Sequence, residues 1–184
     1  MSTVFARLVL AGFLWALASP AAADFSIREA SSRFEDGVYF VDAFIDFEFS
    51  DTALEALENG VPLTLVVEVR IQREGGWFWN RNLVSRKLRY EIRYHALSGL
   101  YEIVDPETGI QERFATRQAA MAKLGELHSI EVARSEELQE KRQHRVALRA
   151  FLDIESLPLP LRPLAYISPQ WHLGTGWKKW RLDR

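Results

Sequence analysis

The chain has 184 residues, of which 48% are hydrophobic and 26% are charged, and its formal net charge is −2. This composition suits a single domain with a sizeable core, and it gives no electrostatic reason to expect nucleic acid or an anionic membrane surface as the main partner. The sequence contains no cysteine, which excludes disulfides, thiolate metal sites and a cysteine nucleophile.

The first 23 residues have the features of a secretory signal peptide. Arg7 precedes an apolar run, residues 8–18, which is shorter than the roughly 20 residues needed to span a bilayer. Ala21, Ala22 and Ala23 fit the small-residue cleavage rule. We predict cleavage between Ala23 and Asp24, export to the periplasm, and no transmembrane segment after cleavage. An uncleaved N-terminal anchor is the alternative, and N-terminal sequencing distinguishes the two.

Alternating hydrophobicity predicts β-strands along most of the mature chain, residues 24–184. The clearest pattern is in residues 63–72, where odd positions are apolar and even positions are mostly polar, as in a strand with one dry and one wet face. Short connections with turn residues favour antiparallel pairing, because parallel strands need long crossovers. The other predicted strands are residues 25–34, 39–49, 87–95, 101–104, 110–115, 129–134 and 142–154.

Two short helices and an unusual tail complete the predicted fold. Ser50 and Thr116 are suitable N-caps for helices in residues 51–59 and 117–127. The alternating prolines of residues 155–163 favour an extended polyproline-type run, and Gly174 and Gly176 suggest a terminal hairpin. Sheets with one dry face must pair. We therefore predict an all-β fold, a two-sheet antiparallel β-sandwich of immunoglobulin-like outline, with a Pro-rich and then Trp-rich tail in residues 157–184.

Acidic residues on one face of the strand at residues 39–49 are the only pattern that suggests catalysis. Asp42, Asp46 and Glu48 lie at alternate positions, where paired carboxylates could bind calcium or act as an acid–base pair. The favoured interpretation is ion pairing across strands with the arginine-rich residues 70–93. The four histidines lack the spacing of metal ligands, and we predict no catalytic, cofactor or metal site.

Aromatic residues mark two candidate interaction sites. Tryptophans in surface turns are frequent interaction hot spots, but they also cover cores, and packing is the favoured interpretation at both places. The first site is a predicted turn and the second is the tail. The candidate interaction residues are Trp77, Phe78, Trp79 and Arg81 in the turn, and Trp171, Trp177 and Trp180 in the tail.

Several of these features together resemble the bacterial domain of unknown function 4390 family. They are LPLPLRP in residues 157–163, WHLGTGW in residues 171–177, Trp180, and the helix at residues 51–59 followed by a long strand. The resemblance covers nearly all of the mature chain. It implies a secreted or periplasmic protein with no established activity, encoded beside a membrane sensor kinase of nitrogen-regulation type, which hints at a signalling partner. It implies no catalytic residues.

The leading functional hypothesis is a non-enzymatic periplasmic accessory domain that binds another protein, such as the outer domain of a sensor kinase in the inner membrane. One alternative is a protein that binds an envelope glycan or a small ligand, with tryptophans as stacking platforms. The other alternative is a metal-dependent hydrolase that uses Asp42 and Asp46. No cofactor is expected.

Overall fold

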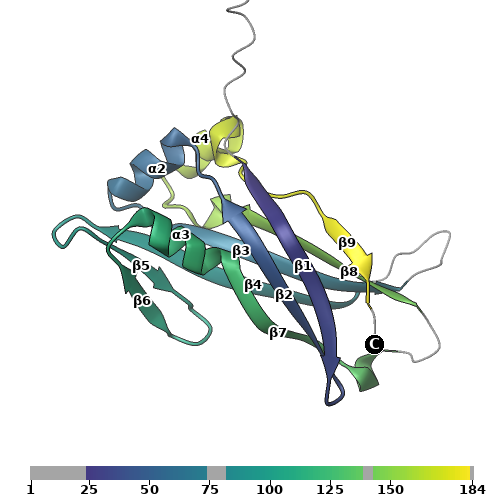
Figure 1. Ribbon diagram of the computed structural model, residues 1–184. Coiled ribbons are helices and arrows are strands. Elements are labelled where there is room, and N and C mark those ends of the chain that lie inside the picture. The colour runs from purple at the N-terminus through teal and green to yellow at the C-terminus, as the bar shows by residue number, and fades with distance from the viewer. Residues whose placement is uncertain (1–23, 74–81, 139–142, 183–184) are drawn as a thin grey trace, which may run out of the picture.

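The computed structural model describes residues 24–73, 82–138 and 143–182. The predicted signal peptide and the predicted turn with Trp77, Phe78, Trp79 and Arg81 lie outside the described residues. Within these ranges, nine β-strands form two antiparallel sheets that pack face to face (Figure 1). The predicted two-sheet sandwich is confirmed.

The two sheets have unequal sizes. The smaller has the strand order β1-β2-β7 and the larger has the order β6-β5-β4-β3-β8-β9, so the likeness to an immunoglobulin outline is confined to the packing of two antiparallel sheets. The strands are β1 (Phe25–Glu35), β2 (Val38–Phe47), β3 (Leu63–Arg73), β4 (Asn82–His95), β5 (Leu100–Val104), β6 (Gln111–Phe114), β7 (Glu126–Arg134), β8 (His144–Leu152) and β9 (Lys178–Arg181).

Within the described ranges, three short α-helices accompany the sheets: α2 (Asp51–Glu58), α3 (Arg117–Gly125) and α4 (Arg162–Ile167). Helices α2 and α3 match the two predicted helices. Figure 1 shows α2 and α4 together at one end of the sandwich, where β1 begins. No helix in the described ranges is long and apolar enough to cross a membrane.

The core lies between the two sheets. Alternate residues of β2, from Tyr39 to Phe47, are buried, as are the odd-numbered residues of β3 from Leu63 to Ile71. This is the alternation that the sequence predicts, since successive side chains of a strand point to opposite faces. On β3, however, the even positions Val66 and Glu68 are buried as well, so the wet face predicted there is wrong over this part of the strand.

The two open sides of the sandwich are closed differently. On one side, Lys178 donates hydrogen bonds to the carbonyl oxygens of Ile27 (3.3 Å) and Arg28 (3.0 Å), and the Trp180 indole donates to Ser32 Oγ (3.1 Å). These bonds join β9 of the larger sheet to β1 of the smaller. On the other side, α3 packs between β2 and the β5–β6 pair (Figure 1).

Two predictions for the C-terminal segment are wrong. The proline-rich stretch was expected to be an extended run, but its end forms the start of α4. Pro163 lies in the first turn of that helix, where a missing N–H breaks no helical hydrogen bond. The expected terminal hairpin is replaced by a long-range pairing. Strand β9 pairs antiparallel with β8, and Gly174 forms a bridge to Phe151.

Ser50 connects α2 to the C-terminal segment. Its hydroxyl accepts a hydrogen bond from the Ala53 N–H (3.2 Å) and donates one to the Gln170 carbonyl oxygen (2.7 Å). We expect Ser50→Ala to lower the free energy of unfolding by about 1 kcal/mol, the usual effect of losing an N-cap. Urea unfolding measures the change, and Ser98→Ala, in an exposed turn, is the control. Equal midpoints for the two variants would contradict the role of the cap.

Candidate functional site

The outer face of the larger sheet carries a basic surface. Strand register places Lys87 opposite Glu68 and Arg89 opposite Val66, while Arg181 of β9 stands opposite Arg145 of β8. Neighbouring strands lie about 5 Å apart, so positive side chains recur from β4 to β9. We use the name basic face for four exposed cations on this surface: Lys87, Arg89, Lys179 and Arg181.

An ion cluster lies in the middle of the same surface. The Glu68 carboxylate accepts hydrogen bonds from Arg70 Nε (2.7 Å) and from Arg149 Nε (2.9 Å) and Nη2 (2.7 Å). The Trp177 ring lies on both guanidinium groups, with its centroid 4.5 Å from Arg70 Cζ and 4.6 Å from Arg149 Cζ. Burial alone would raise the pKa of Glu68, but the bonds from Arg149 and Arg70 outweigh it and hold the pKa below its usual value.

The other acidic groups on this face are also neutralised by neighbours. Glu91 pairs with Arg93. The buried Glu102 pairs with His95 at 2.9 Å and with Arg113 at 2.9 Å. Hydrogen bonds from His95 and Arg113 lower the pKa of Glu102. Glu68, Glu91 and Glu102 are therefore each paired with cations, while Asp153 and Glu155 line a hollow beside Lys87 and Arg89 without an ion pair in the described ranges. In the described part of the chain, the four cations of the basic face form no ion pair.

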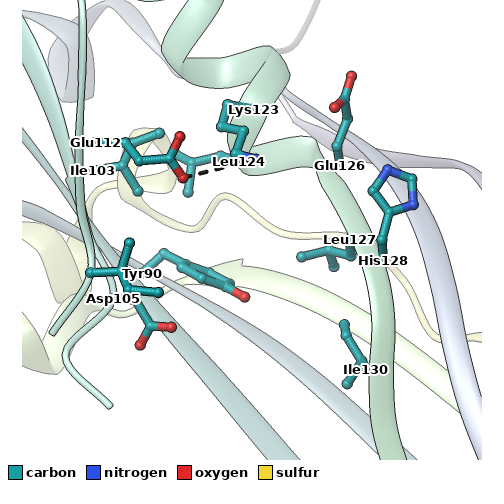
Figure 2. A pocket seen from close by; sticks show the side chains of 11 residues that line it. Tyr90, Ile103, Asp105, Glu112, Lys123, Leu124, Glu126, Leu127, His128 and Ile130 are labelled. Carbon is teal, nitrogen blue, oxygen red and sulfur yellow. Dashed lines mark ion pairs between the residues drawn. The ribbon is translucent and has the colours of Figure 1, made fainter. Parts of the chain in front are cut away.

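A pocket of about 270 Å³ opens on the side of the sandwich that α3 covers. Figure 2 shows its lining, in which the Tyr90 side chain of β4 points from the larger sheet toward Leu127 and Ile130 of β7. Lys123 of α3 and Glu112 of β6 form an ion pair of 3.8 Å at its rim (Figure 2). The pocket thus has an apolar interior and a charged opening.

Comparison with known families agrees with the resemblance seen in the sequence. The family model described as Domain of unknown function (DUF4390) matches residues 22–181, which is nearly the whole chain. The chain belongs to this family. No curated protein and no solved structure matches it significantly.

The tail tryptophans of this DUF4390 domain pack against the sandwich. This agrees with packing as the favoured interpretation of the sequence. Trp171 is buried, with 4% of its surface exposed. Trp177 and Trp180 are partly buried, the first on the ion cluster and the second through its bond to Ser32. A role of these three residues in binding a partner stays a prediction, as does that of Trp77, Phe78, Trp79 and Arg81.

The acidic residues of β2 do not face the arginine-rich strands, so that prediction is wrong. Strands β2 and β4 belong to different sheets, and the arginine partners of the acids come from β1. Asp46 pairs with Arg28 at 2.9 Å and Asp42 pairs with Arg33. Asp42 also accepts a bond from the Ser129 N–H at 2.8 Å. Among the described residues, no group of three metal-ligating side chains occurs.

The DUF4390 domain has two site features that sequence reasoning missed. The sequence shows the positive charge of β4, but its charge pattern predicts that the arginines of β4 form ion pairs with the acidic residues of β2. The pocket was not visible, because its walls come from α3, β4, β5, β6 and β7. Local patterns do not reveal which of these elements become neighbours.

Proposed function

We propose that this DUF4390 protein is a non-enzymatic binding domain of the bacterial periplasm, which docks an acidic surface of another protein against its basic face. The observation that carries the proposal is the surplus of exposed cations on the outer face of the larger sheet. Lys87, Arg89, Lys179 and Arg181 have no acidic partner within the described ranges, while the whole chain has a net charge of −2. The positive charge is therefore concentrated locally.

The shape of the face supports a protein as the partner. The cations stand on the edge strand β9 and on β4, with the ion cluster of Glu68 between them. Rows of charge on a broad sheet surface suit the extended interface of a protein partner, and the pocket of about 300 Å³ beside Lys87 and Arg89 is a hollow within that surface. Complementary charge accelerates encounter and fixes orientation.

The N-terminal sequence supports the compartment, and the family resemblance supports the kind of partner. Residues 1–23 have the composition of a secretory signal peptide. A sensor kinase of the inner membrane would present its outer domain in the same compartment. We therefore place the partner surface on such a membrane protein.

The two alternative functions have less support. Asp42 and Asp46, required for the hydrolase, are both engaged by arginines of β1. The Trp177 ring, a candidate platform for a glycan, is stacked with two guanidinium groups. Trp77 and Trp79 lie outside the described residues, and glycan stacking on them stays a prediction.

Photo-crosslinking in cells tests the docking face. A photoreactive amino acid in place of Arg89 should capture a protein of the envelope. The same amino acid at Ser26, exposed on the other sheet, should not capture it. The variant Lys87→Glu with Lys179→Glu should reduce capture from position 89 about ten-fold, as expected for a loss of about 1.4 kcal/mol in binding.

The charge-reversal variant should fold normally, because neither lysine forms an ion pair in the described structure. Arg134→Glu, an exposed change on the smaller sheet, is the matched control and should leave capture unchanged. Capture of lipid alone from position 89, or equal protein capture from positions 89 and 26, would overturn the proposal.

A further inference from the structure

The pocket beside α3 has the size and lining of a site for a small molecule. Its volume of about 270 Å³ lies just below the usual range for ligand pockets, about 300–1,000 Å³, and suits a ligand of a few heavy atoms. Ile103, Leu124 and Leu127, which contribute to its walls, are nearly buried, with 3–7% of their surfaces exposed. Such walls favour the apolar part of a ligand.

Tyr90 supplies a polar group inside this apolar space. Figure 2 shows its hydroxyl pointing into the pocket, and the hydroxyl forms no hydrogen bond within the described part of the chain. Burial raises the pKa of the Tyr90 phenol, and the charges of Asp105 and Glu107 raise it further. The hydroxyl is therefore protonated at neutral pH and stands in a negative potential.

The opening of the pocket has a surplus of negative charge. Asp105 and Glu112 line it together with Lys123, whereas Figure 2 shows the carboxylate of Glu126 pointing away from the pocket. Lys123 is paired with Glu112 at 3.8 Å, which leaves Asp105 without an ion pair in the described ranges. The carboxylate of Asp105 accepts two backbone hydrogen bonds in its own turn, from Glu107 (2.9 Å) and Thr108 (3.2 Å), which fixes its position at the rim.

We propose that this pocket binds a small molecule with an apolar body and one ammonium group. The apolar body would lie against Leu124 and Leu127, the Tyr90 hydroxyl would bond to a polar atom of the ligand, and the ammonium group would lie at the rim near Asp105. A carboxylic acid of the same size would meet the acidic rim and be repelled. This site is separate from the basic face, so either proposal can fail without the other.

Titration of the full-length protein with three probes of equal length tests the charge preference. The probes are hexylamine, hexanol and hexanoate, and the readout is two-dimensional amide NMR. We expect hexylamine to shift resonances of α3, β5 and β7 in a saturable way, and to bind at least five-fold more tightly than hexanol. Hexanoate should cause no saturable shift.

Three variants locate the site. Tyr90→Phe and Asp105→Asn should each weaken hexylamine binding about five-fold, the effect of one lost hydrogen bond or charge contact. Tyr101→Phe removes a hydroxyl from the same sheet outside the pocket lining and should leave binding unchanged. Equal affinity for hexylamine and hexanoate, shifts located away from the pocket, or the same affinity in Tyr90→Phe and the unaltered protein would overturn the proposal. Absence of hexylamine binding at millimolar concentration would also overturn it.

Discussion

Gly125→Ala is expected to lower the free energy of unfolding by about 3 kcal/mol or more, at the upper end of the usual effect of overpacking a core. Gly125 is the last residue of α3, directly before β7. A Cβ atom at this position would lie 2.1 Å from the carbonyl oxygen of Ile45 and 3.2 Å from its carbonyl carbon. The obstacle is backbone, not the end of a flexible side chain.

The backbone of Ile45 has little freedom to move away. It belongs to β2, the central strand of the smaller sheet, and the Ile45 side chain is buried in the core. Relief of the clash therefore requires α3 to shift, and Leu124 and Leu127 would shift with it. We also expect the variant to lose the pocket.

Urea unfolding followed by tryptophan fluorescence measures this effect. Gly176→Ala is the matched control, since a Cβ atom there would meet no atom within 4 Å. An unfolding midpoint for Gly125→Ala equal to that of Gly176→Ala would contradict the close approach of α3 to β2.

Much of the fold follows from local patterns in the sequence. The alternation in residues 63–72 predicts β3, and its dry face from Leu63 to Ile71 is the wall of the core. The capping residues Ser50 and Thr116 predict the starts of α2 and α3, and both side chains accept the expected backbone bonds. These features depend on neighbours in the chain, which is why sequence alone suffices for them.

The predictions that failed depend on contacts between distant segments. Glu68 looks like an exposed position of β3, but Arg149 of β8 and Trp177 of the tail cover it. The acids of β2 were matched to the arginines of β4, although the nearest cations, Arg28 and Arg33, are in the adjacent hairpin strand. Charge pattern alone does not decide between two possible partner strands.

The same long-range contacts define the candidate sites. The surplus of cations on the basic face is recognised only when the partners of Glu68, Glu91 and Glu102 are known, and this requires the register of β3, β4 and β8. The pocket requires α3 to fold onto the β5–β6 pair. The sequence therefore shows the positive charge of β4, but neither its location on an outer sheet face nor the pocket.

Arg149→Met is expected to lower the free energy of unfolding by about 2 kcal/mol, because it removes two hydrogen bonds from a carboxylate that has no access to water. The Glu68 side chain is 1% exposed, and Arg149 is 35% exposed. Breaking a fully buried pair costs about 3–5 kcal/mol. The expected loss is smaller because solvent screens the arginine side of the pair. The variant also loses the contact of the Arg149 guanidinium with the Trp177 ring.

Two further variants separate the ion cluster from general effects of substitution. Arg89→Met changes an exposed arginine of the same face that has no ion pair in the described structure, and it should change stability by less than about 0.5 kcal/mol. Glu68→Leu combined with Arg149→Met should recover part of the loss, since no buried carboxylate remains. If Arg149→Met and Arg89→Met have the same stability, the cluster does not stabilise the domain.

The dependence on pH gives a second and independent measure of this cluster. The pKa of Glu68 in the folded protein is below its ordinary value of 4.5, so its carboxylate contributes stability that is fully present above the ordinary pKa. This contribution is lost as the pH falls through the lowered pKa, because the group is then protonated in both states. The difference in unfolding free energy between the unaltered protein and Glu68→Gln should therefore be constant at neutral pH and shrink below about pH 4.5. Asp42 and Glu102, whose pKa values are also lowered, contribute equally to both proteins and cancel in this difference. A difference that stays constant down to the acid-unfolded state would mean that Glu68 gains nothing from its arginines.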